Sequence, residues 1–103
     1  MTRPRGVLYS PEAEAQLVAL YGYLAARASP SIAEAYTNAI VDRCDQLGEL
    51  PLAGIARDDI RRGLRTTIFR KRVVIAYAVA AKAVTVLAIF YGGQDWESLL
   101  RDE

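Results

Sequence analysis

Few side chains in this sequence could do acid–base or nucleophilic chemistry. It has no histidine, which removes the commonest general base, the Ser-His-Asp and Cys-His nucleophile systems and most zinc sites. Proton transfer would fall to Lys71, Lys82, Tyr77, Tyr91 or the carboxylates, but the tyrosines stand at strand spacing and Lys82 stands in a turn. The single cysteine, Cys44, is expected in the core. We therefore predict no catalytic residue.

The motifs that hold metals and nucleotides are also missing. One cysteine, no histidine and scattered carboxylates give no metal-ligand spacing. No dinucleotide or Walker glycine motif occurs, and Gly92-Gly93 stands in the wrong context for a phosphate loop. The sequence thus predicts neither a metal nor a cofactor.

Positive charge is concentrated in residues 57–72, which carry a net charge of +5 in a chain whose total is +1. The basic residues of this segment are Arg57, Arg61, Arg62, Arg65, Arg70, Lys71 and Arg72. Such a cluster can bind phosphates or an acidic partner segment, or it can be a solvated loop and strand edge. No aromatic or glycine interleaving marks a nucleic-acid module, and a total of +1 argues against binding nucleic acid over the whole surface. We expect no sequence-specific nucleic-acid binding.

Length and composition indicate one globular domain, residues 1–103. The chain has 52% hydrophobic and 24% charged residues, which is typical of a folded protein. A lone cysteine excludes an internal disulfide and favours a reducing compartment. The first residues do not have the pattern of a signal peptide, so we expect a cytoplasmic protein.

Two amphipathic helices are predicted in the first half. Ser10 is placed to cap a helix over residues 12–28, with Pro11 in its first turn. Ser31 and Glu34 have capping-box spacing for a second helix, which ends at Gly48 and Pro51. Its apolar face is Ile32, Tyr36, Ala39, Ile40, Cys44 and Leu47. Because only a short link joins the first helix to the second, the two helices must fold back on each other as an antiparallel hairpin.

Strands are predicted in the second half. Residues 64–69, 73–79 and 84–90 alternate, and both faces of the last two are largely apolar, so both should be covered. Residues 73–91 are long enough to span a membrane, but Lys82 at the midpoint and the alternation favour two strands. With a short strand at residues 7–9 and a final helix capped by Asp95, with Trp96 as its anchor, the order is β-α-α-β-β-β-α. The fold class is α+β, an antiparallel sheet packed against an α-helical hairpin.

Several segments, taken in order, resemble one known family. They are Tyr9-Ser10-Pro11-Glu12-Ala13, Leu20-Tyr21-Gly22-Tyr23-Leu24, Ala33-Glu34-Ala35-Tyr36, residues 47–54 (Leu-Gly-Glu-Leu-Pro-Leu-Ala-Gly), Gly63-Leu64-Arg65, Val74-Ile75-Ala76-Tyr77 and residues 91–100 with Asp95-Trp96-Glu97. Together they resemble the ParE toxins of the RelE/ParE toxin–antitoxin superfamily over nearly the whole chain. The resemblance implies a bacterial toxin without catalysis of its own, which poisons DNA gyrase and is neutralised by a ParD-like antitoxin.

The sequence departs from the family pattern at two places. Tyr91 stands where the family often has histidine, and the turn in residues 69–72 lacks the usual glycine. Two alternatives therefore stay open: a RelE-like ribosome-dependent mRNA endoribonuclease, and an inactive module that only binds the antitoxin. A ribonuclease must surround the reacting phosphate with cations, whereas Asp95 and Glu97 would repel it. The gyrase poison is therefore favoured.

An antitoxin interface can be predicted from charge. A basic, partly apolar groove between hairpin and sheet would suit an amphipathic acidic peptide. The predicted charged contacts are Arg61, Arg62, Arg65 and Arg72, and the predicted apolar contacts are Leu17, Tyr21 and Leu24. The three apolar residues have a second interpretation as internal core.

Overall fold

The computed structural model describes residues 6–101, which form three helices and five strands. In chain order these are β1 (Gly6–Tyr9), α1 (Pro11–Arg27), α2 (Pro30–Glu49), β2 (Ile55–Ala56), β3 (Leu64–Phe69), β4 (Val73–Val79), β5 (Ala83–Tyr91) and α3 (Trp96–Arg101). Every predicted element is present within two residues of its expected ends. β2 was not predicted, because two residues are too few to show alternation.

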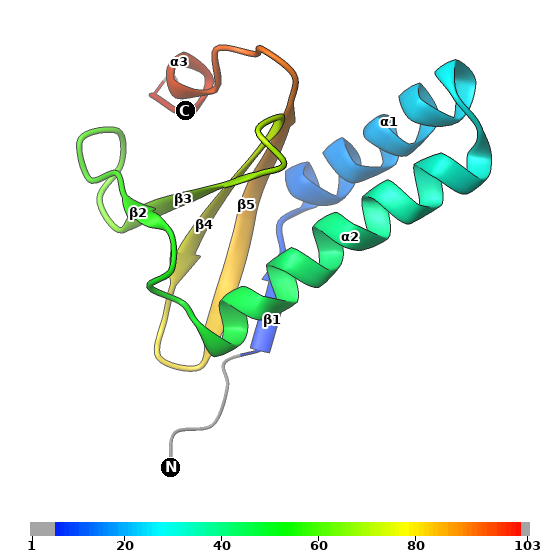
Figure 1. Ribbon diagram of the computed structural model, residues 1–103. Coiled ribbons are helices and arrows are strands. Elements are labelled where there is room, and N and C mark those ends of the chain that lie inside the picture. The colour runs from blue at the N-terminus through cyan, green and yellow to red at the C-terminus, as the bar shows by residue number, and fades with distance from the viewer. Residues whose placement is uncertain (1–5, 102–103) are drawn as a thin grey trace.

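The strands form one sheet in the order β1-β5-β4-β3-β2. The prediction of an antiparallel sheet is confirmed for β2 to β5. β1 differs, because it pairs parallel with β5, Gly6 opposite Ala83 and Tyr9 opposite Val86. A parallel pair needs a long connection, and the helical hairpin together with β2 to β4 provides it. α1 and α2 cover one face of the sheet, and α3 lies against the other (Figure 1).

Both helices of the hairpin begin at a serine followed by proline. The Ser10 Oγ accepts a hydrogen bond from the Ala13 N–H at 3.0 Å, as predicted. For α2, however, the predicted Ser31 cap is wrong. Ser29 is the N-cap, and its Oγ accepts from the Ile32 N–H at 3.1 Å. Pro30 occupies the first helical position, which suits its fixed φ and missing N–H, so the cap must be the residue before it.

The larger core lies between the hairpin and the sheet. The residues buried there are Ala13, Leu20, Ile40, Cys44, Leu47, Val73, Ile75, Tyr77, Val84, Val86 and Ile89. The predicted apolar face of the second helix is therefore correct over most of its length. Ile32 is the exception: at the first turn of α2 it is 54% exposed, and Ala33 is buried instead.

A smaller core covers the opposite face, as the double-sided apolar pattern predicted. It consists of Leu64, Ala76, Ala88, Phe90 and Leu100, with Trp96 packed against it. The two alanines leave little side-chain volume at the middle of this face, so a single short helix is sufficient to cover it. Trp96 anchors α3 here, as predicted.

Residues 73–91 form β4, a turn and β5, so the prediction of two strands instead of a membrane-spanning helix is confirmed. Among the helices in residues 6–101, none combines the length and apolarity that a membrane span requires.

The Tyr77 hydroxyl fixes the chain between α2 and β2. Tyr77 is fully buried, and its Oη donates to the Pro51 carbonyl and accepts from the Gly54 N–H, each at 2.9 Å. A Cβ at Gly54 would lie 2.5 Å from that oxygen and 2.7 Å from the Thr66 carbonyl. Glycine is therefore required at this position, which explains the Pro-x-x-Gly spacing of residues 51–54.

We predict that Tyr77→Phe lowers the free energy of unfolding by about 1–3 kcal/mol, because it leaves the buried Gly54 N–H without an acceptor. Urea denaturation followed by circular dichroism measures this change. Tyr21→Phe is the matched control: Tyr21 is 39% exposed, and this change should alter stability by less than about 0.5 kcal/mol. Equal stability of the two variants would show that the Tyr77 hydrogen bonds contribute nothing.

Candidate functional site

The four arginines predicted to bind an antitoxin do not form one cluster. Arg61 and Arg62 lie in the loop between β2 and β3, near α3. The Arg61 Nη2 donates to the Leu100 carbonyl at 3.2 Å, so this side chain helps to hold α3, whereas Arg62 is exposed.

Arg65 and Arg72 lie elsewhere on the sheet. The Arg65 Nη2 donates to the carbonyls of Leu52 and Gly54, at 3.3 and 3.0 Å, and so supports the turn that Tyr77 holds from inside. Arg72 is the last residue of the β3–β4 turn and is exposed. Of the four arginines, Arg72 is the one that lines the groove between hairpin and sheet described below.

The three apolar residues predicted for the same interface lie on α1. Leu17 and Leu24 are half-buried and pack against the larger core. Tyr21 is mostly outside it, with 39% of its surface exposed. Leu17 and Leu24 therefore have a structural role in addition to any contact with a partner.

The edge of β5 beyond β1 is closed by side chains. β1 pairs with β5 only from Ala83 to Val86, since the chain turns into α1 at Ser10. Further along, the Ser10 Oγ donates to the Leu87 carbonyl at 2.8 Å. The Ile89 N–H donates to Gln16 Oε1 at 2.6 Å, and the Tyr91 N–H to Gln94 Oε1 at 3.3 Å. Two glutamine amides thus take the place of a neighbouring strand.

Beside this edge lies a groove of about 560 Å³, which we call the β5-edge groove. It is lined by Gln16, Ala19, Leu20, Tyr23, Arg72, Ile89, Tyr91, Gly92 and Gln94. A second hollow of about 490 Å³ is lined by Arg70, Lys71, Arg72, Gly92 and Gly93. Both are lined by Arg72 and Gly92, so the two hollows are neighbours.

The β3–β4 turn, in a strained conformation, places three cations at the second hollow, and one of them, Arg72, also lines the β5-edge groove. Arg70 and Lys71 have φ values of 50° and 62°, in the left-handed region where glycine or asparagine is usual. The Arg72 N–H donates to the Phe69 carbonyl at 3.1 Å and closes the turn. Two consecutive non-glycine residues in this region cost about 1–2 kcal/mol each. The structure tolerates this strain where the sequence concentrates positive charge.

An aromatic cluster supports the turn and the groove. Ring centroids lie 5.9 Å apart for Tyr23 and Tyr91, and 6.1 Å apart for Tyr36 and Tyr91. The Arg70 guanidinium lies 4.8 Å from the Phe69 ring centroid and 5.5 Å from that of Tyr36. Burial, and next the nearby Tyr91, raise the pKa of Tyr36, so its hydroxyl is protonated at neutral pH.

Other side chains that the sequence offered for acid–base or nucleophilic chemistry are bound into the fold or lie away from the groove. Tyr77 is committed to the turn of residues 51–54, and Lys82 is exposed in the β4–β5 turn. Cys44 is buried, and burial raises the pKa of its thiol to about 11, which disfavours the reactive thiolate. Within residues 6–101, no group of three or more Cys, Asp or Glu side chains is placed to hold a metal ion.

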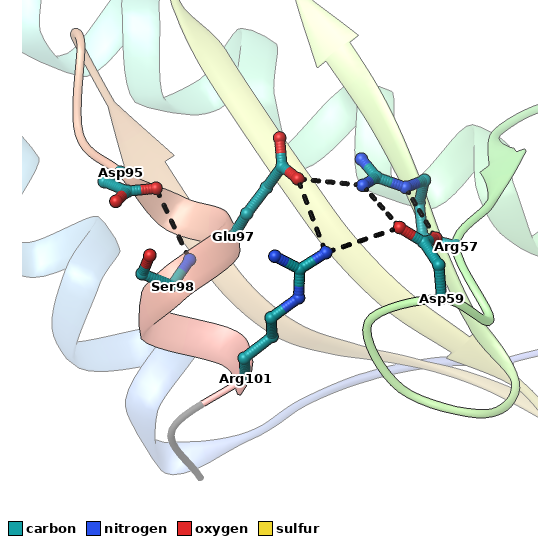
Figure 2. Close-up of polar contacts among 6 residues, drawn as sticks. All are labelled: Arg57, Asp59, Asp95, Glu97, Ser98 and Arg101. Atoms are coloured by element: carbon teal, nitrogen blue, oxygen red, sulfur yellow. Dashed lines mark hydrogen bonds and ion pairs between the residues drawn. The ribbon is translucent and has the colours of Figure 1, made fainter.

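The helix α3 is held by a network of four charges (Figure 2). The Arg57 Nη2 lies 2.9 Å from both Asp59 Oδ2 and Glu97 Oε2, and the Arg101 Nη2 lies 3.5 Å from Asp59 Oδ2. The Arg57 guanidinium also lies 5.2 Å from the centroid of the Trp96 ring. Glu97, expected from the sequence to repel phosphate, is instead paired within the protein. The pair was not predictable, because it joins residues 40 positions apart.

The Asp95-Trp96-Glu97 motif thus has three structural functions. Asp95 Oδ1 accepts from the Ser98 N–H at 3.4 Å and caps α3, as predicted. Trp96 packs on the smaller core, and Glu97 pairs with Arg57. All three functions position α3 against the sheet.

We predict that Arg57→Gln loosens α3. Trp96, the only tryptophan in the chain, should then show red-shifted emission and faster quenching by acrylamide.

The same network should make the position of α3 depend on pH. Hydrogen bonding from Arg57 lowers the pKa of Asp59, so the stabilisation that this carboxylate gives to α3 is complete above its ordinary pKa and is lost as pH falls through the lowered value. The Trp96 signal of the parent should therefore be constant from pH 5 to 8 and change below about pH 4.

Lys82→Gln, at an exposed turn, is the charge-matched control for this experiment. Identical Trp96 quenching in Arg57→Gln and the parent protein would contradict the proposed role of the network.

Comparison with known proteins agrees with this architecture. A family model described as the ParE toxin of the type II toxin–antitoxin system parDE matches residues 7–96. Among solved structures, the chain is similar to "Chromosomal ParDE TA system from P. aeruginosa", with a TM-score of 0.75 and 23% sequence identity. The match covers 88% of this chain and 99% of that chain, and it shows a shared fold. The search of curated proteins gives no match.

The family match covers most of the chain, including α1, α2, the sheet and the start of α3. It confirms the resemblance drawn from the sequence motifs. The chain therefore belongs to the ParE toxin family of type II toxin–antitoxin systems.

Proposed function

We propose that this toxin is a cytoplasmic protein that arrests growth by binding and poisoning DNA gyrase, without catalysis of its own. The family match over residues 7–96 supports a toxin, and the lining of the β5-edge groove carries the choice of mechanism. That lining contains tyrosines, glutamines and an arginine, with no carboxylate among its described residues. Such a lining supports a role in binding, whereas general acid–base catalysis needs a group that titrates near neutral pH.

The RelE-like ribonuclease is the second candidate, and one observation favours it. Arg72 and Tyr91 line the same groove, so a cation and a phenol could both face a phosphate there. Such a reaction would still need a base for the 2′-hydroxyl, and the raised pKa of the neighbouring Tyr36 keeps that phenol protonated.

We predict that purified toxin makes gyrase accumulate cleaved plasmid DNA and lose supercoiling activity. Agarose gels of supercoiled and relaxed plasmid, with gyrase omitted as the control, measure both effects. A parallel translation reaction should leave its mRNA intact. Normal supercoiling at saturating toxin would contradict the proposal. mRNA cleavage would then support the ribonuclease. The absence of both activities would support an inactive antitoxin-binding module.

We further propose that a ParD-like antitoxin neutralises the toxin through an amphipathic acidic segment. The proposed contacts are those predicted from the sequence: Arg61, Arg62, Arg65, Arg72, Leu17, Tyr21 and Leu24. Within this set, Arg62, Arg72 and Tyr21 have the most exposed side chains, while Arg61 and Arg65 already donate to backbone carbonyls. The exposed members can therefore be changed without disturbing the loops.

We predict that Arg62→Gln combined with Arg72→Gln weakens antitoxin binding about 2- to 30-fold and reduces its dependence on salt, because exposed charge pairs contribute about 0.2–1 kcal/mol each. Titration calorimetry at 50 and 300 mM NaCl measures both quantities. Lys82→Gln is the control at the opposite end of β4. Unchanged affinity and salt dependence in the double variant would contradict this interface.

A further inference from the structure

We propose that the outward face of α1 is a dimerisation surface, through which two copies of the free toxin pair with their α1 helices antiparallel. The residues of this face recur at spacings of three and four and are Ala15, Val18, Ala19, Gly22 and Ala26. The contact is uncharged in the middle and charged at both ends. The proposal goes beyond gyrase poisoning and depends neither on it nor on the proposed antitoxin contacts.

The outward face of α1 is apolar although it is exposed. No charged residue occurs in α1 between Glu14 and Arg27. Val18 is 72% exposed, and the exposed rings of Tyr21 and Tyr23 flank the face on its two sides. A helix that faces water usually carries charged or polar side chains opposite its buried face. The outward face of α1 instead has the composition of a surface that a partner covers.

The neighbouring helix α2 shows the composition of a solvated face in the same protein. α1 and α2 lie side by side over one face of the sheet (Figure 1). The exposed residues of α2 include the carboxylates Glu34, Asp42, Asp45 and Glu49. Such charges keep a helix face in water, since burying them would be costly. Of the two helices of the hairpin, α1 is therefore the one whose outward face is suited to burial.

Gly22 indicates that another backbone comes close to this face. It lies inside α1, where glycine is less favourable than alanine. A Cβ at this position would meet nothing within 4 Å among the described residues, so packing inside the chain does not require glycine there. With Ala19 and Ala26 beside it, however, Gly22 lets the axis of a second helix approach closely, because the distance between two helices depends on the side chains at their contact.

The charges at the two ends of α1 select a second copy as the partner. The first turn carries Glu12 and Glu14, and the last turn carries Arg27. In an antiparallel pair the first turn of each helix lies beside the last turn of the other, so opposite charges meet at both ends. The Arg27 guanidinium lies 4.5 Å from the Tyr23 ring centroid, at the flank of the face. Within residues 6–101 neither Glu14 nor Arg27 forms an ion pair, so both are available to the second copy.

A second copy fits this face better than an acidic peptide does. The face offers an acidic peptide no cation along its length, and the exposed carboxylates of the adjoining α2 would repel it. With 17 residues α1 is about 25 Å long, and one helix face of this length is at the small end of protein interfaces. We therefore expect a weak and reversible dimer.

Sedimentation velocity of the full-length toxin alone, at 5 to 500 μM protein, measures the pairing. Gly22→Gln places a longer side chain on the contact and should raise the dimer dissociation constant about 10-fold or more. Gly22→Ala adds one methyl group and should have a smaller effect. Because glutamine and alanine both favour a helix more than glycine does, each variant should unfold at a higher temperature than the parent at 5 μM. Loss of pairing then does not come from unfolding.

An exchange of charges tests the antiparallel orientation. Arg27→Glu makes both ends of α1 acidic, and Glu12→Lys combined with Glu14→Lys makes both ends basic. Each variant alone should pair about 3- to 30-fold more weakly than the parent, because like charges then meet at both ends. An equimolar mixture of the two should pair as well as the parent, which a folding defect would not allow. In a parallel pair like charges already meet in the parent, so unchanged pairing of each variant alone would overturn the proposal.

Ala35→Gln is the matched control, because it adds the same side chain at an exposed position of α2 and should pair like the parent. A parent toxin that stays monomeric at 500 μM would overturn the proposal. So would a dimer that Gly22→Gln leaves intact, or one that Ala35→Gln weakens equally. If the toxin is monomeric and Gly22→Gln instead weakens its binding to the antitoxin or to gyrase, the face serves that partner and not a second copy.

Discussion

The buried hydroxyl of Tyr77 organises one side of this molecule. By binding both Pro51 and Gly54 it fixes the chain as it leaves α2, and β2 begins at the next residue. Arg65 donates to the same turn from the surface. Directly after β2, Arg57 pairs with Glu97 and holds α3 against the far face of the sheet. A short series of contacts therefore connects a core tyrosine with the C-terminal helix, and the motifs most typical of the family lie along it.

On the opposite side of the molecule, the β5-edge groove exists because β1 is shorter than β5. Because the chain enters α1 at Ser10, β5 continues beyond its parallel partner, and Gln16 and Gln94 bind the N–H groups that a strand would have taken. An exposed strand edge invites pairing with another chain, and the two amides close this one. The groove that results lies beside the strained, positively charged turn. Within residues 6–101, charge pairs thus lie at α3, whereas the cations of the β3–β4 turn form no ion pair.

Local patterns were sufficient to predict every element except β2, but not the surfaces. The alternation of β3, β4 and β5, the Ser10 cap and the Trp96 anchor follow from neighbouring residues. The parallel pairing of β1, the two-residue β2 and the Arg57–Glu97 pair depend on segments far apart in the chain. A groove between hairpin and sheet was predicted, but of its lining only Arg72 was named, since Tyr23, Tyr91 and Gln16 come from elements far apart in the chain. The seven basic residues lie within the one segment 57–72, but the fold divides them among α3, the turn of residues 51–54 and the β3–β4 turn.

The central claim is that this toxin acts by occupying its target and not by turnover. Titrating toxin against a fixed amount of gyrase, and measuring the fraction of enzyme that no longer supercoils DNA, tests it most directly. Inhibition should rise in proportion to the toxin bound, saturate near a fixed ratio of toxin to gyrase, and be reversed when antitoxin removes the toxin. Complete and irreversible loss of activity at toxin levels far below that of gyrase would contradict it.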